Sequence, residues 1–586
     1  MDQVLRTVFG KKYDESLLDS VTDYELSVEN SMLVPRQELV AWLRELHEYG
    51  RKILLISDIY LPASHLERLV EHGGFADCVD GIISSADTFL AKASGKAYPY
   101  IMERFSLDKN SWLHIGDNPI SDGLRPLEFG IQALVLQDYA ERQRKTIVKR
   151  HINYSAGKPF WRGRALLQLM QPHEGENIPQ PDLYIEGYNF LAPMIGAFVQ
   201  HLAEESLKLG ITKIFFLSRE GWTFKRFWEK CTPILFPGIT LPETEYLYAS
   251  RMALAGSSCA YQGLTRTNFD ISFLPPGNKD FRDVCRIFNL DGKALEPHLA
   301  RYGLRCDTVL SPVHEGFMAE YRQQMNELLD DDAFQEEIRI QTEPANQAMM
   351  RYFEDIGFFG HEHVALVDIG WLGTIQRFLY EAVSHRPDCP RCQGFLFGAT
   401  RGLVYPTSPK NSIRGIIYDR HEFDFAASSI LYARDLFEEA CRAPHPTLNG
   451  YALTDDGYEL EFRKTDDSLG QAEQVQDSYY APLQEGIFAA AERYAAASRL
   501  LGFSLVDYRP WLNYTMVSKL AFPKSSEIAN IKHKYHLDDF HGTHKPMQAF
   551  TKREKSLWSS SMLQLRFNPL LRLKYFNTHI RMVLNG

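Results

Sequence analysis

The sequence predicts an α/β protein built around parallel sheets. Short apolar runs alternate with stretches of helical periodicity, which is the pattern of strands joined by crossover helices. The chain has 586 residues, of which 45% are hydrophobic, so two to four domains with packed cores are expected. We expect helices at the start, then a Rossmann-like parallel sheet, then a second α/β domain with a helical insertion.

Changes in this pattern place the domain boundaries. A polar stretch with several prolines predicts a linker, and the last part of the chain reverses the acidic charge of the rest. The expected regions are a helical segment 1–34, a Rossmann-like unit 35–145, a linker 146–182, a second α/β domain 183–445, a helical insertion within it at about 280–357, a mixed region 446–551 and a basic, aromatic tail 552–586.

An amphipathic helix and four apolar runs make up the first unit. The helix is predicted over Pro35–Gly50, where the glycine is a natural C-terminal stop. The expected strands are Ile53–Ile56, Gly81–Ile83, Trp112–Ile115 and Ile131–Leu136. Stretches with helical character separate these runs, so one parallel sheet with crossover helices is predicted.

The second α/β domain is predicted from strands that lead into polar or glycine-containing turns. The expected strands are Lys213–Leu217, Val364–Asp368 and Gly394–Phe397. Farther along the chain, Asp455–Gly457 is typical of a tight turn between two hairpin strands.

Composition and charge narrow the class of protein. A formal net charge of −11 argues against a surface that grips nucleic acid, although a local basic patch is compatible with it. Eight cysteines show no disulfide framework, which favours a reducing compartment. No apolar stretch reaches the ~20 residues of a membrane span, and the N-terminus lacks the pattern of a signal peptide. We therefore expect a cytoplasmic protein that does not bind nucleic acid.

Polar residues of the first unit follow its predicted strands, where open α/β sheets place their ligands. Ser57 ends the first strand, and its hydroxyl can hold a phosphate oxygen. Lys92 precedes a helix and can neutralise phosphate charge. Asp117 and Asp122 flank a turn, and their carboxylates could converge on one hard cation. Each residue alone is more often structural, but together they describe a Mg²⁺-assisted phosphate site.

The order of these four residues resembles the second, third and fourth motifs of the haloacid dehalogenase (HAD) superfamily. The string Ser57-Asp-Ile-Tyr-Leu-Pro62 is similar to one in a subgroup of predicted HAD hydrolases, which are associated with bacterial glycosyltransferases and surface-polysaccharide synthesis. So is Leu113-His-Ile-Gly-Asp-Asn118, whose Asn118 is a candidate for substrate binding. The resemblance covers about residues 25–138 and implies a HAD-like Rossmannoid sheet, with residues 1–34 as the remnant of a helical cap.

The resemblance implies a role for each residue of this site. Ser57 would bind the phosphoryl group of the substrate. Lys92 would stabilise that group together with the nucleophile, and Lys96 is the alternative lysine. Asp117 would ligate Mg²⁺, and Asp122 would support the metal site.

The first motif of the family is missing. HAD catalysis needs Asp-x-Asp on a strand before Ser57: one carboxylate attacks phosphorus and the other acts as general acid and base. No such strand is predicted here, and Asp58 lies too close to Ser57 to replace a residue of another strand. The missing piece would be a central strand, so its absence leaves ladder groups unpaired. The chain either lacks its natural N-terminus or is a non-catalytic remnant, and we expect no hydrolysis of phosphate esters by the chain as it stands.

A second set of candidates follows strands of the second domain. Arg219, Arg251 and Thr374 lie near predicted helix starts, where free N–H groups favour an anion, and are candidates for phosphate binding. Asp368 and Glu220 are the candidate carboxylates. The alternative interpretation is that these are close-packed turns between strands and helices. No reaction is predicted for them.

The resulting hypothesis is a bacterial protein of surface-polysaccharide synthesis with an incomplete HAD-like phosphohydrolase module. By resemblance, its ligand would be a phosphorylated sugar or a compound related to nucleotide-sugars. Mg²⁺ would be its cofactor, and glycosyltransferases would be its partners. Two alternatives stand beside it: a non-catalytic accessory protein that binds such ligands or enzymes, and a transferase centred on the second α/β domain.

The basic tail over 552–586 is a candidate for contact with a membrane. It contains seven Lys or Arg residues and one acid, with aromatic and aliphatic residues between them. Such a segment can lie on an anionic membrane surface or dock on a partner, because apolar anchors and positive charge act together. Packing of the tail onto the body of the protein is at least as strongly expected. A place at the periphery of the inner membrane is thus compatible with a cytoplasmic protein.

Overall fold

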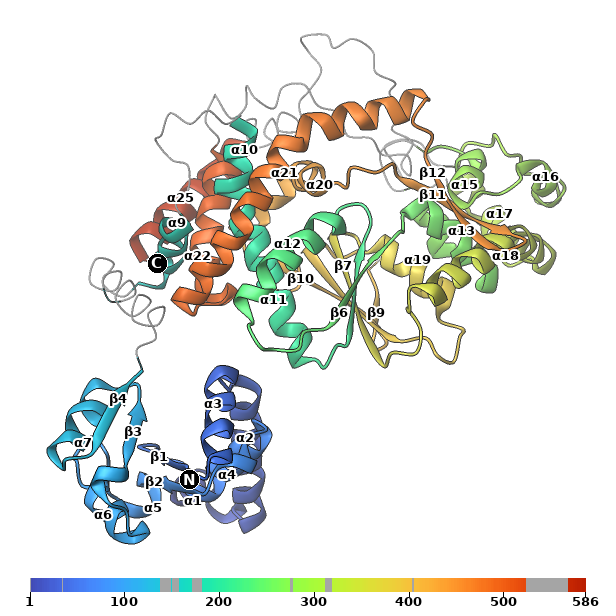
Figure 1. Cartoon of the computed structure of the whole chain (residues 1–586). Coiled ribbons are helices and arrows are strands. Elements are labelled where there is room, and N and C mark those ends of the chain that lie inside the picture. Colours follow the sequence, from blue (N-terminus) through green and yellow to red (C-terminus); the bar gives the residue numbers. More distant parts are fainter. Residues whose placement is uncertain are drawn as a thin grey trace. The chain divides into compact units, whose positions relative to one another are not determined.

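The computed structural model describes residues 2–33, 35–136, 149, 158–170, 182–273, 278–310, 319–402, 405–522 and 568–585. The chain divides into two compact units, which consist of residues 1–146 with 236–240 and of residues 147–235 with 241–586 (Figure 1). Each unit contains helices and parallel strands. The predicted α/β class with mainly parallel sheets is therefore confirmed.

Helices make up most of the first unit. The segment predicted to be helical at the start contains α1 (Asp2–Phe9) and α2 (Glu15–Met32). Asp14 caps α2, because its carboxylate accepts a hydrogen bond from the amide of Leu17. The remaining helices and helical turns are η1 (Gly10–Lys12), α3 (Gln37–Glu48), α4 (Ala63–His72), η2 (Ala76–Cys78), α5 (Ser85–Thr88), α6 (Ala97–Phe105), η3 (Lys109–Ser111), η4 (Pro119–Leu124) and α7 (Arg125–Glu128).

The strands of the first unit form two separate parallel pairs. β1 (Leu54–Ser57) pairs with β2 (Gly81–Ser84), and β3 (Leu113–Gly116) pairs with β4 (Gln132–Val135). All four strands lie where the sequence predicts them, but no hydrogen-bonded ladder joins the two pairs among the described residues. The prediction of one continuous sheet is therefore wrong for this unit. The physical reason is an open space between β1 and β3, described below.

The second unit contains a six-stranded sheet in the order β6-β5-β7-β8-β10-β9. Its strands are parallel except for β9, which pairs antiparallel with β10. The central strand β7 is buried at eight of its nine residues, as expected where helices cover both faces of a parallel sheet. The strands are β5 (Lys213–Leu217), β6 (Glu243–Leu247), β7 (His363–Trp371), β8 (Arg391–Ala399), β9 (Thr407–Ser408) and β10 (Asn411–Asp419).

Helices precede and interrupt this sheet. The predicted helical insertion is found as α15 to α18. These helices pack their apolar residues into one core with β5, β7 and α19. The helices and helical turns up to residue 441 are η5 (Pro159–Trp161), α9 (Arg162–Met170), α10 (Asp182–Glu186), η6 (Gly187–Leu191), α11 (Ala192–Lys208), α12 (Gly221–Leu235), α13 (Arg251–Gln262), α14 (Arg266–Ser272), α15 (Phe281–Phe288), α16 (Gly292–Arg301), α17 (Ala319–Leu329), α18 (Asp332–Asp355), α19 (Thr374–Val383), η7 (Ala427–Tyr432) and α20 (Arg434–Cys441).

The C-terminal part of the second unit begins with a hairpin. β11 (Leu448–Thr454) and β12 (Gly457–Phe462) pair antiparallel, so the predicted hairpin is found, and the pairing of Thr454 with Gly457 leaves two residues in its turn. The helices that follow are α21 (Ser468–Leu501), α22 (Leu505–Met516), η8 (Val517–Ala521) and α25 (Pro569–Asn585). No helix among the described residues is long and apolar enough to cross a membrane.

Two predicted regions contain structure that their composition hides. The range predicted as a linker, 146–182, contains α9, whose Ala165 and Leu166 are buried and which packs on α21 and α22. Prolines and polar residues on both sides of α9 conceal this short helix in the sequence. In the predicted tail, 568–585 are described and include α25, whereas 552–567 lie outside the described residues.

Candidate functional site

The predicted residues of the first unit gather around one buried carboxylate. Asp122 is only 2% exposed. It accepts hydrogen bonds from Lys92 Nζ at 2.7 Å, His114 Nε2 at 3.1 Å and the amide of Asn118 at 3.0 Å. Burial alone would raise the pKa of Asp122, but these three hydrogen bonds outweigh it and lower that pKa. The Asp122 carboxylate, which follows β3, is thus held in its charged form beside Lys92, which lies in the loop before α6.

A tight backbone approach brings Asp122 to this place. A Cβ atom on Gly116 would lie 2.4 Å from Cγ of Asp122, which is far inside van der Waals contact. Only glycine at the end of β3 therefore lets the aspartate side chain pack against the strand. Tyr98 closes the other side: it is fully buried, its hydroxyl donates to the carbonyl of Ser121, and its ring meets His114 edge-on at 5.2 Å.

A second aspartate fixes the position of Lys92. The Asp58 carboxylate accepts hydrogen bonds from the amides of Lys92 at 2.8 Å and Ala93 at 3.0 Å. Asp58 directly follows Ser57 at the end of β1, so it ties the lysine loop to the first strand pair. Lys92 meanwhile binds Asp122 of the second pair. The lysine loop thereby links the two halves of the unit across the open space.

The remaining candidates of this site lie at the same strand ends. Ser57 and Asp117 line the cavity described below, and Asp117 is exposed. Asn118 has a structural task, because its side-chain oxygen accepts hydrogen bonds from the amides of Ile120 and Ser121. The geometry therefore brings Ser57, Lys92, Asp117 and Asp122 to one edge, while the hydrogen bonds of Asn118 shape the turn of η4.

A long apolar cavity separates β1 from β3. Its volume is about 1150 Å³, and its walls include Ile53–Ser57 of the first pair, Leu113–Asp117 of the second pair and the apolar face of α3. Leu113 is 48% exposed and no residue of β1 is fully buried. Inner strands of parallel sheets are normally buried on both faces. The exposed strands and the cavity together have the form of a place for one more strand.

A metal site is incomplete in the described part of the chain. HAD-like chemistry implies a hard divalent cation, which prefers several oxygen ligands. Asp117 offers a carboxylate at the strand end, but the Asp122 carboxylate already accepts from Lys92. No group of three or more His, Cys, Asp or Glu residues that could hold a metal ion occurs among the residues with described positions. These residues alone do not fit the cation, and any complete site needs further carboxylates.

The second unit places its candidate carboxylates at a topological switch point. β5 has β6 on one side and β7 on the other, so the chain changes direction across the sheet at the gap between β5 and β7. Glu220 follows β5, and Asp368 lies on β7. Open α/β sheets bind their ligands in the crevice at the carboxyl ends of such strands.

Burial and neighbouring negative charges act on both carboxylates. Asp368 is 5% exposed, and its carboxylate accepts a hydrogen bond from the amide of Ile369 at 2.7 Å. Burial raises the pKa of Asp368 well above its usual value, and the charge of Glu220 raises it further. Burial and the charge of Glu438 raise the pKa of Glu220. The pair therefore holds protons more firmly than ordinary carboxylates do.

Arg219 is engaged by the protein itself. Its guanidinium donates to Glu473 at 2.9 Å, to Asp477 at 3.0 Å and to the carbonyl of Ala443 at 3.0 Å. These contacts join the end of β5 to α21 and to the segment between α20 and β11. Thr374 is buried at the first turn of α19, and Arg251 begins α13 after β6. The predicted residues thus lie at neighbouring strand ends, but the donors of Arg219 face acidic side chains.

The sequence reasoning missed several residues of these sites. His114 and Asp58 both stand inside the strings that carry the family resemblance, yet their contacts become visible only once the strand ends meet. Glu438 approaches Glu220 from α20, more than 200 residues along the chain. No local pattern signals such a long-range neighbour.

Neither the models of protein families nor the curated proteins give a match to this chain.

Proposed function

We propose that the first unit is a HAD-like phosphate-ester module whose sheet accepts one further strand that carries the catalytic carboxylates. The observation that supports this most is the cavity between β1 and β3, which Ser57 and Asp117 line, together with the ion pair of Lys92 and Asp122 that follows the same strand ends. All regular elements described before β1 are helices, so none of them fills this place.

The chemistry of the proposed module follows from the positions of its residues. The Ser57 hydroxyl would donate to a phosphate oxygen, and Lys92 would neutralise part of the phosphate charge. A carboxylate of the added strand would attack phosphorus and break the bond to the ester oxygen, which would leave as the alcohol after it takes a proton from the second carboxyl group in its protonated form. Water would then hydrolyse the aspartyl-phosphate and release inorganic phosphate. A bound Mg²⁺, held by Asp117 and the added carboxylates, would neutralise charge on the phosphate.

The proposed setting is surface-polysaccharide synthesis in the bacterial cytoplasm. By resemblance, the substrate is a phosphorylated sugar or a compound related to nucleotide-sugars, and the partners are glycosyltransferases. The strand-end cluster supports only the phosphate part of this assignment, because Ser57 and Lys92 are general phosphate ligands.

Hydrolysis of p-nitrophenyl phosphate in the presence of Mg²⁺ tests the proposal. The chain as it stands should release no p-nitrophenol. A variant with an apolar strand that ends in Asp-x-Asp, fused before Met1, should release it. Replacing the first added aspartate by asparagine, or Asp117 by alanine, should abolish that release. Activity of the unfused chain that disappears in Asp117→Ala would show that the nucleophile is already present.

The switch point of the second unit supports a second candidate function. We infer from Asp368, Glu220 and the neighbouring helix starts that this unit binds a ligand there, either as a non-catalytic accessory protein or as a transferase. Thermal unfolding with a panel of nucleotide-sugars and sugar phosphates tests this. Stabilisation that disappears in Asp368→Asn would support the site, and an identical response of the variant would count against it.

A further inference from the structure

The C-terminal helix α25 has two faces with different surroundings. Tyr575 is 1% exposed and belongs to a small core with Ala426, Val517 and Ala521. On the other side of the helix, large apolar side chains face solvent. A surface helix of a globular protein normally has an apolar face toward the body and a polar face toward water. The outer face of α25 departs from that rule.

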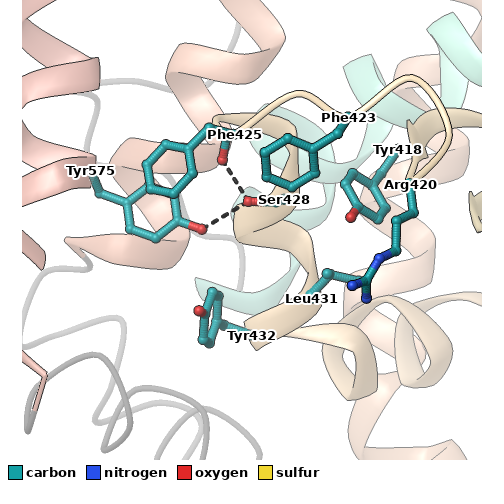
Figure 2. Close-up of a pocket in the computed structure, with 8 residues that line it drawn as sticks. All are labelled: Tyr418, Arg420, Phe423, Phe425, Ser428, Leu431, Tyr432 and Tyr575. Carbon is teal, nitrogen blue, oxygen red and sulfur yellow. Dashed lines mark hydrogen bonds between the residues drawn. The ribbon is translucent and has the colours of Figure 1, made fainter. Parts of the chain in front are cut away.

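The inner face anchors the helix to the second unit. Tyr575 stacks on Phe425 with ring centres 4.4 Å apart, and its hydroxyl lies 3.1 Å from that of Ser428. Figure 2 shows this contact at one side of an aromatic pocket. His579 stacks on Tyr514 of α22 at 4.3 Å and contacts the hydroxyl of Ser518. The predicted packing of the tail onto the body is thus found for this helix.

The outer face carries a stripe of exposed apolar residues, with Asn577 as a polar residue among them. Leu570, Leu573 and Leu584 are 73%, 55% and 64% exposed, respectively. Phe576, Ile580 and Val583 are exposed as well and recur at helical spacing. At 3.6 residues per turn, this stripe lies roughly opposite Leu571, Tyr575, Thr578, His579 and Met582, which are at least partly buried.

Basic residues border the stripe on both sides. Arg572 falls on one border between the inner and outer faces, and Lys574 and Arg581 fall on the other. All three are exposed, and the helix contains no Asp or Glu. The positive charge contrasts with the net charge of −11 of the whole chain. An apolar stripe between basic borders is the arrangement of helices that lie in a membrane interface.

We propose that the outer face of α25 docks on an anionic lipid surface. The apolar stripe would enter the boundary between headgroups and acyl chains, while the three basic side chains reach the lipid phosphates. The charge pattern selects this occupant: an uncharged protein surface would gain nothing from the basic borders. The contact needs no spanning helix, because α25 lies in the plane of the surface and remains packed on the body by Tyr575.

Sedimentation with vesicles tests the proposal on the full chain. Vesicles of phosphatidylcholine with about one-third phosphatidylglycerol should bind the protein, and pure phosphatidylcholine vesicles should bind it much more weakly. The double variant Leu573→Glu/Phe576→Glu should lose about tenfold or more in affinity. Each replacement among Arg572→Gln, Lys574→Gln and Arg581→Gln should lose about fivefold, and added salt should weaken binding.

A control variant separates binding through α25 from non-specific binding to the vesicles. Val475 is an exposed apolar residue of α21, so Val475→Glu places a glutamate at another exposed apolar position of the second unit and should bind as the original chain does. The proposal is overturned if the original chain ignores anionic vesicles, or if the α25 variants bind as strongly as Val475→Glu. If the chain self-associates without lipid, and the same α25 variants abolish that self-association, the occupant of this face is a second copy of the chain and the proposal is wrong.

Discussion

The two units contain parallel strands of the same kind but differ in how those strands are flanked. β7 of the second unit lies between β5 and β8, and its residues are almost all buried. β1 of the first unit pairs with β2 alone among the described residues, and every residue of β1 is partly exposed. Yet both units carry charged side chains at the carboxyl ends of these strands. Polar groups of a site can therefore be in place while the sheet that supports them has an open position.

The comparison also explains how the first unit holds together. Asp58 ties Lys92 to the first strand pair, and Asp122 ties the same lysine to the second pair. In the second unit the backbone ladder itself joins neighbouring strands. The first unit thus relies on side-chain hydrogen bonds at the point where the second unit uses a continuous sheet.

The largest effect is expected from the buried cation of the continuous sheet. Arg219→Gln removes a buried cation that Glu473 and Asp477 share, so that only Arg463 and Arg442 remain as their cationic partners, and should lower the free energy of unfolding of the second unit by about 3–5 kcal/mol. Urea denaturation measures this loss. Arg226→Gln, an exposed arginine on α12, serves as control and should cost less than about 1 kcal/mol. A small loss in Arg219→Gln would show that this arginine is free to serve a ligand.

Apolar truncations compare the two sheets directly. Leu366→Ala in β7 should cost about 2–5 kcal/mol, because the side chain is fully enclosed. Leu54→Ala in β1 should cost only about 1 kcal/mol, because Leu54 is half-buried beside the cavity. Urea unfolding of each variant, followed by a probe in the affected unit, gives both values. Equal costs would mean that β1 is enclosed as fully as β7.

The carboxylates at the end of β3 should differ from each other. Asp122→Asn removes the charged partner of Lys92 and should cost the first unit about 2 kcal/mol. Asp117→Asn, five positions earlier and exposed, should change stability by less than about 0.5 kcal/mol. Thermal unfolding of both variants checks the contrast. Similar losses of stability in the two variants would indicate that Asp117 also stabilises the folded unit.

The smallest expected effects are changes in folding stability with pH, and these changes have opposite signs in the two units. The pKa of Asp122 is lowered in the folded protein, so its contribution is present above the usual value of 3.8 and is lost as pH falls through the folded value. The pKa of Asp368 is raised, so the folded second unit binds more protons and loses stability as pH rises above 3.8.

Denaturation across the pH range should separate these contributions. Asp122→Asn should reduce the stability that the first unit loses as pH falls through the acid range. Asp368→Asn should reduce the stability that the second unit loses as pH rises toward neutral. Unchanged pH profiles in both variants would contradict the assigned environments.

Much of the fold was predictable because its strands are short apolar runs between helices. The four strands of the first unit and β5, β7 and β8 of the second lie at their predicted places. β6 was not predicted, because its Glu243-Thr-Glu-Tyr-Leu247 begins with three polar residues and forms no apolar run, as suits a half-exposed strand at the edge of the sheet. The open position beside β1 follows from the sequence only through the missing Asp-x-Asp strand.

The sequence predicted which residues lie near each site better than it predicted their contacts. Ser57, Lys92, Asp117 and Asp122 meet at one edge because parallel strands end together. The partners of Arg219 could not be predicted, since Glu473 lies 254 residues away and reaches it only through the packing of α21. Long-range ion pairs of this kind leave no local pattern in the chain.

Amide hydrogen exchange resolved along β1, β3 and β7 tests the central claim most directly. Alternate amides of β1 and β3 point toward the open space and lack a ladder partner, so they should exchange far faster than all amides of β7. Addition of an Asp-x-Asp strand before Met1 should slow the exchange of those amides of β1 and β3. Uniformly slow exchange in β1 and β3 of the unmodified chain would contradict an open strand position between them.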